Sequence, residues 1–413
     1  MAADLQSTVA MDYLLFDTGP FGFPAPRVPI TAPLRRGALR GWGRPDDALP
    51  AWGPKPRFYS RARYALRDAF ALSGVGPGGG ALVPAYHCRT MLDPALALGA
   101  PVALYAIETD LSVNVADVAR LLTRARQPIK AVLAPHFYGQ AQDLGELAAL
   151  CHQHGAALIE DCAHALPLRS PSNGMGRTGD YCIASPYKFF PCEDGGVLWR
   201  GDGQPLPPLP ALRRPSLRTE LGQWRSLQAK GRMRPPSPRF APEQGELAPL
   251  TAAERNAQQV AVRQPGCSTD YLAAREGLAC SRLSQWLIGQ ADVAALLARR
   301  RSHYQRWVQA VQGLPHATAL RPQLGASDTP YMFALQLSQP GRHFAALKRA
   351  GLPMWRWDNL AASDCAVSAG YRLALVQLPC HQGLSDSDLN WMASVLHSVL
   401  TADSPERIAG GAP

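Results

Sequence analysis

The stretch that decides the fold is LIEDCAHALPLRSPSNGMGRTGDYCIASPYKFFPCEDGG, residues 158–196. It opens on a short apolar run that ends at Asp161, and a second such run, 180–185, is followed at once by Lys188. Short apolar runs bounded by turn residues indicate buried strands. Because ligands of parallel sheets bind beyond the carboxyl ends of the strands, we expect Asp161 and Lys188 to face the same crevice.

The residues before this stretch alternate between strand-like and helical patterns. Helical spacing of apolar residues occurs at 115–124 and 143–154. Alternating strands and helices imply right-handed crossovers and a mostly parallel sheet covered on both faces. We therefore expect an α/β fold, in which four apolar runs upstream of residue 161 form buried strands: 81–84, 102–105, 131–134 and 157–160.

Composition divides the rest of the chain. Residues 1–57 are rich in Pro, Gly and Arg and predict an irregular N-terminal arm. Residues 58–280 form the large α/β domain, interrupted by a Pro-rich insertion at 201–275 that cannot form a core sheet. Residues 281–403 predict a long helix over 283–304 and then a smaller α+β domain, before a tail at 404–413. That domain contains strand-like PYMFALQL (330–337), a helix around 344–350, the segments 351–357 and 371–378, and a final helix over 385–400.

Overall composition excludes several classes of protein. The chain has 413 residues, of which 46% are hydrophobic, so it is too apolar to be disordered. No apolar run reaches the length of roughly 18 residues that a membrane span needs. The N-terminus carries Asp4 and lacks a basic region, so we expect a cytoplasmic protein without a secretory signal. The chain thus indicates a folded protein that does not interact with membranes.

Cysteine and charge exclude further partners. The nine cysteines are scattered without any CxxC pair, which argues against a disulfide framework and a zinc ribbon, and we expect no metal. The net charge of +10 is spread along the chain, and its short arginine runs are not interleaved with aromatic residues. We therefore expect no nucleic-acid partner, and an anionic small molecule explains the basic surface as well.

Asp161 and Lys188 are the residue types that pyridoxal 5'-phosphate (PLP) catalysis requires. A carboxylate keeps the pyridine nitrogen of the cofactor protonated, and a lysine amine bonds to its aldehyde and later moves a proton. Spacing in the sequence alone is a weak signal and favours the alternative, in which Asp161 is a helix N-cap and Lys188 is a solvated loop lysine.

Motifs in a fixed order favour the first interpretation. The core motifs are HFYGQ (136–140), IEDCAHA (159–165), GRTGD (176–180) and DGG (194–196), with GVGPGGGALVPAYHC (74–88) upstream and CSRLSQWLIGQAD (280–292) and QLPCHQGLSDSDL (377–389) downstream. The set resembles the DegT-type sugar aminotransferase family of fold-type I PLP enzymes, over about 58–400 apart from the insertion. The resemblance implies a large domain around a seven-stranded, mostly parallel sheet, a smaller C-terminal α+β domain, PLP as cofactor, and a homodimer with active sites at the subunit interface.

The same resemblance assigns roles to particular positions. Lys188 matches the lysine that bonds to PLP, and Asp161 matches the partner of the ring nitrogen. His164 matches the residue beside the phenolic oxygen of the cofactor. Ser185 resembles the phosphate-binding serine, although only two residues separate it from Lys188, where the family usually has a longer connection.

The phosphate-binding turn departs from the family pattern. The family's Ser-Gly-Thr turn corresponds to Ser60-Arg61-Ala62-Arg63. Backbone N–H groups at a helix start, here around Ala62, bind phosphate whatever the side chains are. Arg63 or Arg61 would add a charge-assisted contact, unless both belong to a solvated helix face.

Two further positions differ from the pattern of the family. The aromatic residue that stacks on the cofactor corresponds to Cys88, with Tyr86 and His87 beside it. The asparagine that reaches the phosphate of the neighbouring subunit corresponds to Cys280, and Arg282 is the candidate substitute. Both positions are expected to approach the cofactor of the partner subunit.

The resemblance implies a PLP-dependent aminotransferase, which moves an amino group from an amino-acid donor such as glutamate to a ketone or aldehyde, with nucleotide-linked keto-sugars as the family's acceptors. A PLP enzyme of another reaction type (elimination, dehydration or carbon–carbon bond chemistry) and a non-catalytic degenerate homologue are the alternatives. Cys192, four residues after Lys188, is not expected to be a nucleophile. His381 is expected to be structural or adjacent to the substrate.

Overall fold

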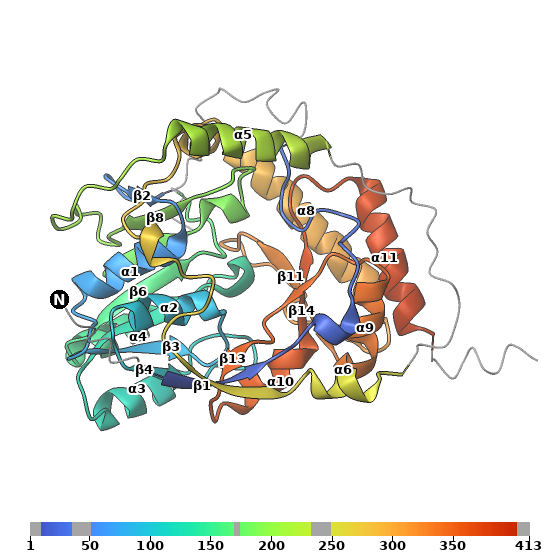
Figure 1. Ribbon diagram of the computed structural model, residues 1–413, viewed down its shortest axis with the longest axis horizontal. Coiled ribbons are helices and arrows are strands. Elements are labelled where there is room, and N and C mark those ends of the chain that lie inside the picture. Colours follow the sequence, from blue (N-terminus) through green and yellow to red (C-terminus); the bar gives the residue numbers. More distant parts are fainter. Residues whose placement is uncertain (1–9, 35–50, 169–173, 233–248, 403–413) are drawn as a thin grey trace, which may run out of the picture.

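The computed structural model describes residues 10–34, 51–168, 174–232 and 249–402. Some of the sequence-based expectations concern residues outside these ranges. These residues are 1–9 and 35–50 of the arm, 233–248 of the insertion and the tail at 404–413. Figure 1 shows the large sheet on the left of the view and a smaller sheet, with β11 and β14, on the right.

The large sheet has seven strands in the order β2-β8-β7-β6-β5-β3-β4. The four neighbouring pairs from β7 to β4 are parallel, whereas β8 is antiparallel to both of its neighbours. A mostly parallel sheet is thereby confirmed. Its strands are β2 (Arg57–Tyr59), β3 (Gly80–Pro84), β4 (Val102–Tyr105), β5 (Ile129–Pro135), β6 (Ala157–Cys162), β7 (Tyr181–Ala184) and β8 (Gly196–Trp199).

Four helices alternate with these strands, and the last two lie where the apolar spacing predicts helices, at 115–124 and 143–154. They are α1 (Ala62–Leu72), α2 (Arg89–Ala97), α3 (Val115–Arg124) and α4 (Gly145–Gln153). The side chain of Asn114 caps α3 by accepting the N–H of Asp117. All five residues of β3 are buried, as expected of a strand in a sheet covered on both faces.

The C-terminal part is built around an antiparallel four-stranded sheet in the order β10-β11-β14-β12. The single helix predicted over 283–304 is wrong, because the chain turns at Gln290 and Asp292 starts a new helix by accepting the N–H of Ala295. In the segment 371–378, residues 371–374 end a helix and residues 375–378 belong to a strand. The elements are α7 (Arg282–Gly289), α8 (Val293–Val311), β10 (Ala317–Ala319), β11 (Met332–Leu337), α9 (Pro340–Arg349), β12 (Trp355–Arg356), α10 (Ala366–Ala374), β14 (Leu375–Pro379) and α11 (Asp386–Leu400).

The N-terminal arm and the insertion are more regular than predicted. β1 (Ala10–Leu15) is the central strand of a third sheet, between β9 (Val260–Pro265) of the insertion and β13 (Leu360–Ala361). The insertion also contains α5 (Leu217–Arg232) and α6 (Ala252–Asn256), and α5 lies across the top of Figure 1. These strands depend on partners far away in the sequence, which local patterns do not reveal.

Buried apolar side chains form two clusters. The first surrounds the seven-stranded sheet. The second joins the four-stranded sheet to α8, α9 and α11, and it includes Phe16, Phe21 and Val28 of the N-terminal arm. The domain boundaries drawn from the sequence stay a prediction. Within the described residues, no helix combines the length and apolarity needed to cross a bilayer.

Candidate active site

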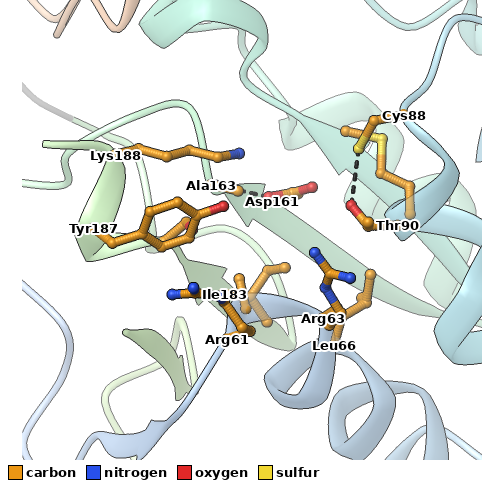
Figure 2. A pocket seen from close by; sticks show the side chains of 13 residues that line it. Arg61, Arg63, Leu66, Cys88, Thr90, Asp161, Ala163, Ile183, Tyr187 and Lys188 are labelled. Atoms are coloured by element: carbon orange, nitrogen blue, oxygen red, sulfur yellow. Dashed lines mark hydrogen bonds between the residues drawn. The ribbon is translucent and has the colours of Figure 1, made fainter. Parts of the chain in front are cut away.

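A pocket opens where the carboxyl ends of β6 and β7 meet the N-terminus of α1 (Figure 2). The structure brings six of the eight predicted site residues to this pocket: Ala62, Arg63, Cys88, Asp161, Ser185 and Lys188. The remaining lining residues are Arg61, Leu66, Thr90, Met91, Ala163, Ile183 and Tyr187.

Asp161 is a buried carboxylate at the end of β6, where it pairs with Ile183 of β7. One carboxylate oxygen accepts the N–H of Ala163 at 2.7 Å, and no helix begins within residues 162–168, so the N-cap interpretation is wrong. Burial raises the pKa of Asp161, although the N–H of Ala163 and the charge of Lys188 oppose the shift. A carboxylate kept away from water in this way is stabilised by a cationic N–H partner.

Lys188 ends a short 3-10 turn (Pro186–Lys188) that directly follows β7. Its side chain is half-buried and extends across the pocket toward Asp161, as Figure 2 shows. The Nζ atom lies 5.5 Å from the centre of the Tyr331 ring. Lys188 is therefore a pocket residue and not a solvated loop lysine.

His164 lies beside the pocket within a group of aromatic rings. Its ring centre is 4.6 Å from that of Tyr331, 5.3 Å from Trp357 and 5.7 Å from Tyr138. Its Nδ1 accepts the backbone N–H of Tyr138 at 3.4 Å, so the hydrogen of the neutral ring is on Nε2. Burial and the charge of Lys188 lower the pKa of His164 well below its ordinary value. The imidazole is thus a neutral N–H donor.

The start of α1 is held against β8 by the glycine pair 195–196. The N–H of Gly195 donates to the carbonyl of Ser60 at 3.0 Å. A Cβ on Gly196 would lie 2.3 Å from the carbonyl carbon of Arg61, so only glycine permits this approach. The first N–H groups of a helix have no partner within it, and Ala62 at the start of α1 lines the pocket. This geometry suits an anion such as phosphate.

Two arginines add positive charge at the same end of the pocket. Arg61 donates to the carbonyl of Glu193, and its guanidinium lies 4.6 Å from the centre of the Tyr187 ring. Arg63 donates to the carbonyl of Asp270. Both are half-buried, which argues against a solvated helix face. Because both bonds go to neutral carbonyl groups, the charges remain available to an anion.

Cys88 is the member of the segment 86–88 that faces the pocket. Its Sγ lies 3.0 Å from Oγ1 of Thr90, whereas the hydroxyl of Tyr86 bonds to that of Tyr138 and Nε2 of His87 accepts the N–H of Ala361. Burial raises the pKa of the Cys88 thiol. A thiol offers no aromatic face, so the stacking residue of the family has no aromatic equivalent in this segment.

Cys280 and Arg282 do not line the pocket of their own chain. Cys280 is buried with its Sγ 3.6 Å from Oδ1 of Asp194. Arg282 is exposed, and its backbone N–H donates to the carboxylate of Glu220. The role of Arg282 toward a partner subunit stays a prediction.

Two other candidate residues have structural contacts. Cys192 is buried, its thiol donates to the carbonyl of Asp194 at 3.3 Å, and burial raises its pKa, which disfavours a nucleophilic thiolate. Nε2 of His381 lies 2.9 Å from the carbonyl of Pro29, so His381 ties the N-terminal arm to the C-terminal part.

His136, Glu160 and Cys162 form a buried group whose ligand atoms lie close enough together to hold a metal ion. Nδ1 of His136 accepts the N–H of Gln142, so Nε2 carries the hydrogen and donates to Glu160 at 2.8 Å. The same carboxylate accepts backbone N–H groups of the loop 176–179. These hydrogen bonds explain the group as a structural link between β6 and that loop.

Sequence reasoning missed several residues of the site. Tyr187 and Thr90 line the pocket. Their short distance in the sequence from Lys188 and Cys88 is the signal that could have identified them. Tyr331 and Arg300 contact the lysine segment from the C-terminal part. Arg300 stands in a run of three arginines, 299–301, and its contacts arise only from the fold, so the sequence does not single it out.

A lysine and a buried carboxylate close to a helix N-terminus, at the carboxyl edge of a mostly parallel sheet, are the arrangement expected of fold-type I PLP enzymes. Residues 60–233 match the model of the DegT/DnrJ/EryC1/StrS aminotransferase family. The match covers the part of the chain that contains Asp161 and Lys188.

Curated relatives are similar over the same part of the chain. GDP-perosamine synthase of Vibrio cholerae is 35% identical over 132 residues, 32% of this chain and 34% of that protein. The UDP-N-acetyl-3-dehydro-alpha-D-glucosamine 3-aminotransferase of Acidithiobacillus ferrooxidans is 30% identical over 140 residues, 34% of this chain and 36% of that protein. The chain thus matches only about a third of the length of these relatives.

Solved structures share the fold over most of the chain. The aminotransferase TlmJ of Streptoalloteichus hindustanus has a TM-score of 0.59 at 19% identity, over 91% of this chain and 99% of that one. A putative sugar aminotransferase of Streptococcus pneumoniae has a TM-score of 0.61 at 13% identity, over 93% and 100%. A PLP form of the latter protein has also been solved, with a TM-score of 0.59 at 15% identity over 90% and 98%.

Proposed function

We propose that the chain is a PLP-dependent aminotransferase that moves an amino group from an amino acid to a carbonyl compound. The observation that carries the proposal is the presence of Lys188 and Asp161 in one pocket, above the N-terminus of α1. PLP, when bound, supplies an electron-withdrawing ring over which negative charge at the reacting carbon is spread.

The donor set of the pocket fits this cofactor. Asp161 is a buried carboxylate suited to a cationic ring N–H. The Nε2–H of His164 is a neutral donor suited to the phenolic oxygen. The phosphate would be held by the first N–H groups of α1, the hydroxyl of Ser185 and the charges of Arg61 and Arg63. Positive charges at this end of the pocket and a negative one at Asp161 match the charge distribution of PLP.

Lys188 performs two tasks in the proposed reaction. Its Nζ would hold the cofactor through the aldehyde carbon. The same Nζ, once free, would be the general acid–base group that moves a proton of the donor's α-carbon. The 3-10 turn after β7 aims the side chain across the pocket toward this position.

A nucleotide-linked keto-sugar is the acceptor we propose, with an amino acid such as glutamate as donor. The support is the names of two relatives, a GDP-perosamine synthase and an aminotransferase of a UDP-linked dehydro-glucosamine.

Borohydride reduction followed by peptide mass spectrometry tests the proposal. The purified protein with PLP is expected to carry a reduced PLP adduct on Lys188, and added glutamate is expected to bleach the visible absorbance of the bound cofactor. Lys188→Ala abolishes both signals, whereas Lys230→Ala, at an exposed lysine paired with Glu193, preserves them. An adduct on another lysine, or absorbance that glutamate leaves unchanged while another substrate alters it, contradicts transamination at Lys188.

We further propose that the enzyme acts as a homodimer. Four large apolar side chains are exposed on the touching helices α5 and α7: Leu217 (83%), Leu221 (59%), Trp224 (39%) and Trp286 (51%). Exposed aromatic groups of this kind are enriched in protein interfaces, and Arg282 lies beside them on α7. Trp286→Glu is expected to halve the mass measured by analytical ultracentrifugation, whereas Trp355→Glu, an exposed residue on β12, leaves it unchanged. A wild-type protein with the mass of one chain contradicts the dimer.

A further inference from the structure

Arg300 of α8 is a fully buried arginine that makes its hydrogen bonds to neutral groups. Its Nη2 donates to the carbonyl groups of Lys188 at 3.0 Å and Phe189 at 3.4 Å. Its Nη1 donates to the carbonyl groups of Pro330 and Tyr331, both at 3.2 Å. These carbonyl groups belong to two segments that meet at the candidate active site.

The fifth hydrogen bond of Arg300 links its guanidinium to Gln382 of the C-terminal part. Nε of Arg300 donates to Oε1 of Gln382 at 2.9 Å, and Nε2 of Gln382 donates in turn to the carbonyl of Phe189 at 2.8 Å. Cζ of the guanidinium also lies over the Phe189 ring, 4.7 Å from its centre. The carbonyl of Phe189 therefore accepts from both side chains, which fixes the residue directly after Lys188.

The second segment that Arg300 holds also reaches the lysine. Tyr331, whose carbonyl accepts from Arg300, places its ring 5.5 Å from Nζ of Lys188 and 4.6 Å from the ring of His164. One guanidinium thus fixes the backbone of the lysine and the aromatic ring against which its amine lies. Burial lowers the pKa of Arg300 to about 10, so the group is still charged at neutral pH.

We propose that Arg300 is a positioning residue that holds Lys188 in the geometry needed to bond to the cofactor aldehyde. The inference rests on the proposed attachment of PLP to Lys188. A planar fork with donors in fixed directions spans carbonyl groups of two segments at once, which the single ammonium group of lysine cannot do. A side chain anchored on both sides approaches a reacting carbon more often in the correct direction.

The test measures how fast PLP becomes attached to Lys188 after it is added to the cofactor-free protein. Samples are reduced with borohydride at intervals, and the adduct is quantified by peptide mass spectrometry. Arg300→Met and Arg300→Lys remove the fork, and Gln382→Leu removes its support. Arg301→Met is the matched control, because Arg301 also donates to backbone carbonyl groups, those of Gly325 and Asp328, away from Lys188.

We expect attachment to slow by about 10-fold or more in both Arg300 variants, since misplacement of a reacting group by about 1 Å costs up to roughly 100-fold. Gln382→Leu is expected to slow it less, and Arg301→Met is expected to match the wild type. The pH midpoint of the visible absorbance of the bound cofactor is expected to shift in the Arg300 variants alone. A merely structural arginine would lower the melting temperature of the Arg300 and Arg301 variants without these specific changes.

The outcomes distinguish the proposed function from the positioning role of Arg300. Failure of the wild type to form an adduct at Lys188 overturns the proposed function and this inference with it. An adduct at Lys188 that forms equally fast in the Arg300 variants overturns this inference alone. If Arg300→Met does not fold, Arg300→Lys and Gln382→Leu decide the question, and wild-type rates in both overturn the positioning role.

Discussion

Asp161 shows how the fold prepares a single residue for a charged ligand. Its burial raises its pKa above that of the unfolded chain, so the folded protein without cofactor binds a proton at Asp161 more readily than the unfolded chain does. The charged carboxylate therefore destabilises the cofactor-free protein at neutral pH, and this cost is relieved as the pH falls through the raised pKa. The residue is kept in a state that a cationic partner stabilises.

Asp161→Asn is accordingly expected to leave the cofactor-free protein as stable as the wild type or more stable at pH 7. The difference in free energy of unfolding between the two is expected to shrink as the pH is lowered, because protonation removes the buried charge from the wild type. Urea denaturation at several pH values measures it. Asp12→Asn, at a carboxylate that is 61% exposed, is the control and is expected to show no such trend. A variant that is less stable at pH 7 would contradict the argument.

The same substitution is expected to have the opposite effect on catalysis. An amide cannot hold a proton on the ring nitrogen of the cofactor, so Asp161→Asn should lower kcat by about 100-fold or more. Steady-state rates with saturating PLP measure this loss. Normal turnover in the variant would show that Asp161 does not serve the cofactor ring.

Prediction of single site residues from the sequence succeeds where the chemistry is local. Asp161 and Lys188 each follow an apolar run, so their meeting in one pocket follows from the pattern of strands. Arg300 is 112 positions from Lys188, and nothing around it distinguishes it from its neighbours Arg299 and Arg301. Its contacts arise only when α8 packs against the lysine segment.

At the scale of elements, the junction between α1 and β8 forms the expected phosphate site. A Cβ at Gly196 would meet the backbone of Arg61 and Ala62, so Gly196→Ala must displace the start of α1. Overpacking of this kind costs about 1–3 kcal/mol, which corresponds to roughly 5- to 150-fold in affinity if it is relieved by moving the helix start. Equilibrium titration with PLP is expected to show that loss.

Gly222→Ala is the matched control for that substitution. Gly222 lies within α5, and a Cβ there meets no heavy atom within 4 Å. We expect unchanged PLP affinity, and stability that is the same or higher, since alanine favours a helix over glycine by about 1 kcal/mol. Equal PLP affinity in the two variants would show that the close approach of Gly196 does not shape the phosphate site.

Helices and strands could be predicted from the sequence where the residues that specify them lie within the element or beside it. α3 begins and ends where the apolar spacing indicates, because Asn114 and the amphipathic pattern lie within the helix or beside it. The break between α7 and α8 had local signals as well, in Gly289 and the N-cap Asp292, but the continuous helical spacing obscured them. β1 had no sufficient local signal, since its pairing partners are more than 200 positions away.

At the scale of the whole molecule, the N-terminal arm connects parts that are distant in the sequence. β1 lies between strands of the insertion and of the C-terminal part, and His381 bonds to the carbonyl of Pro29. Phe16 and Phe21 pack in the second cluster, with ring centres 5.1 Å apart. The arm is thus part of the core of the C-terminal half, which also supplies Arg300 and Tyr331 to the site.

Phe21→Ala tests this connection. Truncation of a buried phenylalanine typically costs about 3–5 kcal/mol, so we expect a loss of that size in the free energy of unfolding, measured by urea denaturation. Leu272→Ala, at a residue that is 47% exposed, should change it by no more than about 0.5 kcal/mol. Because the arm packs on the elements that hold Lys188 in place, Phe21→Ala should also weaken PLP binding, although Phe21 is absent from the pocket lining. A variant with wild-type stability would mean that the arm lies on the surface of the protein and contributes nothing to its core.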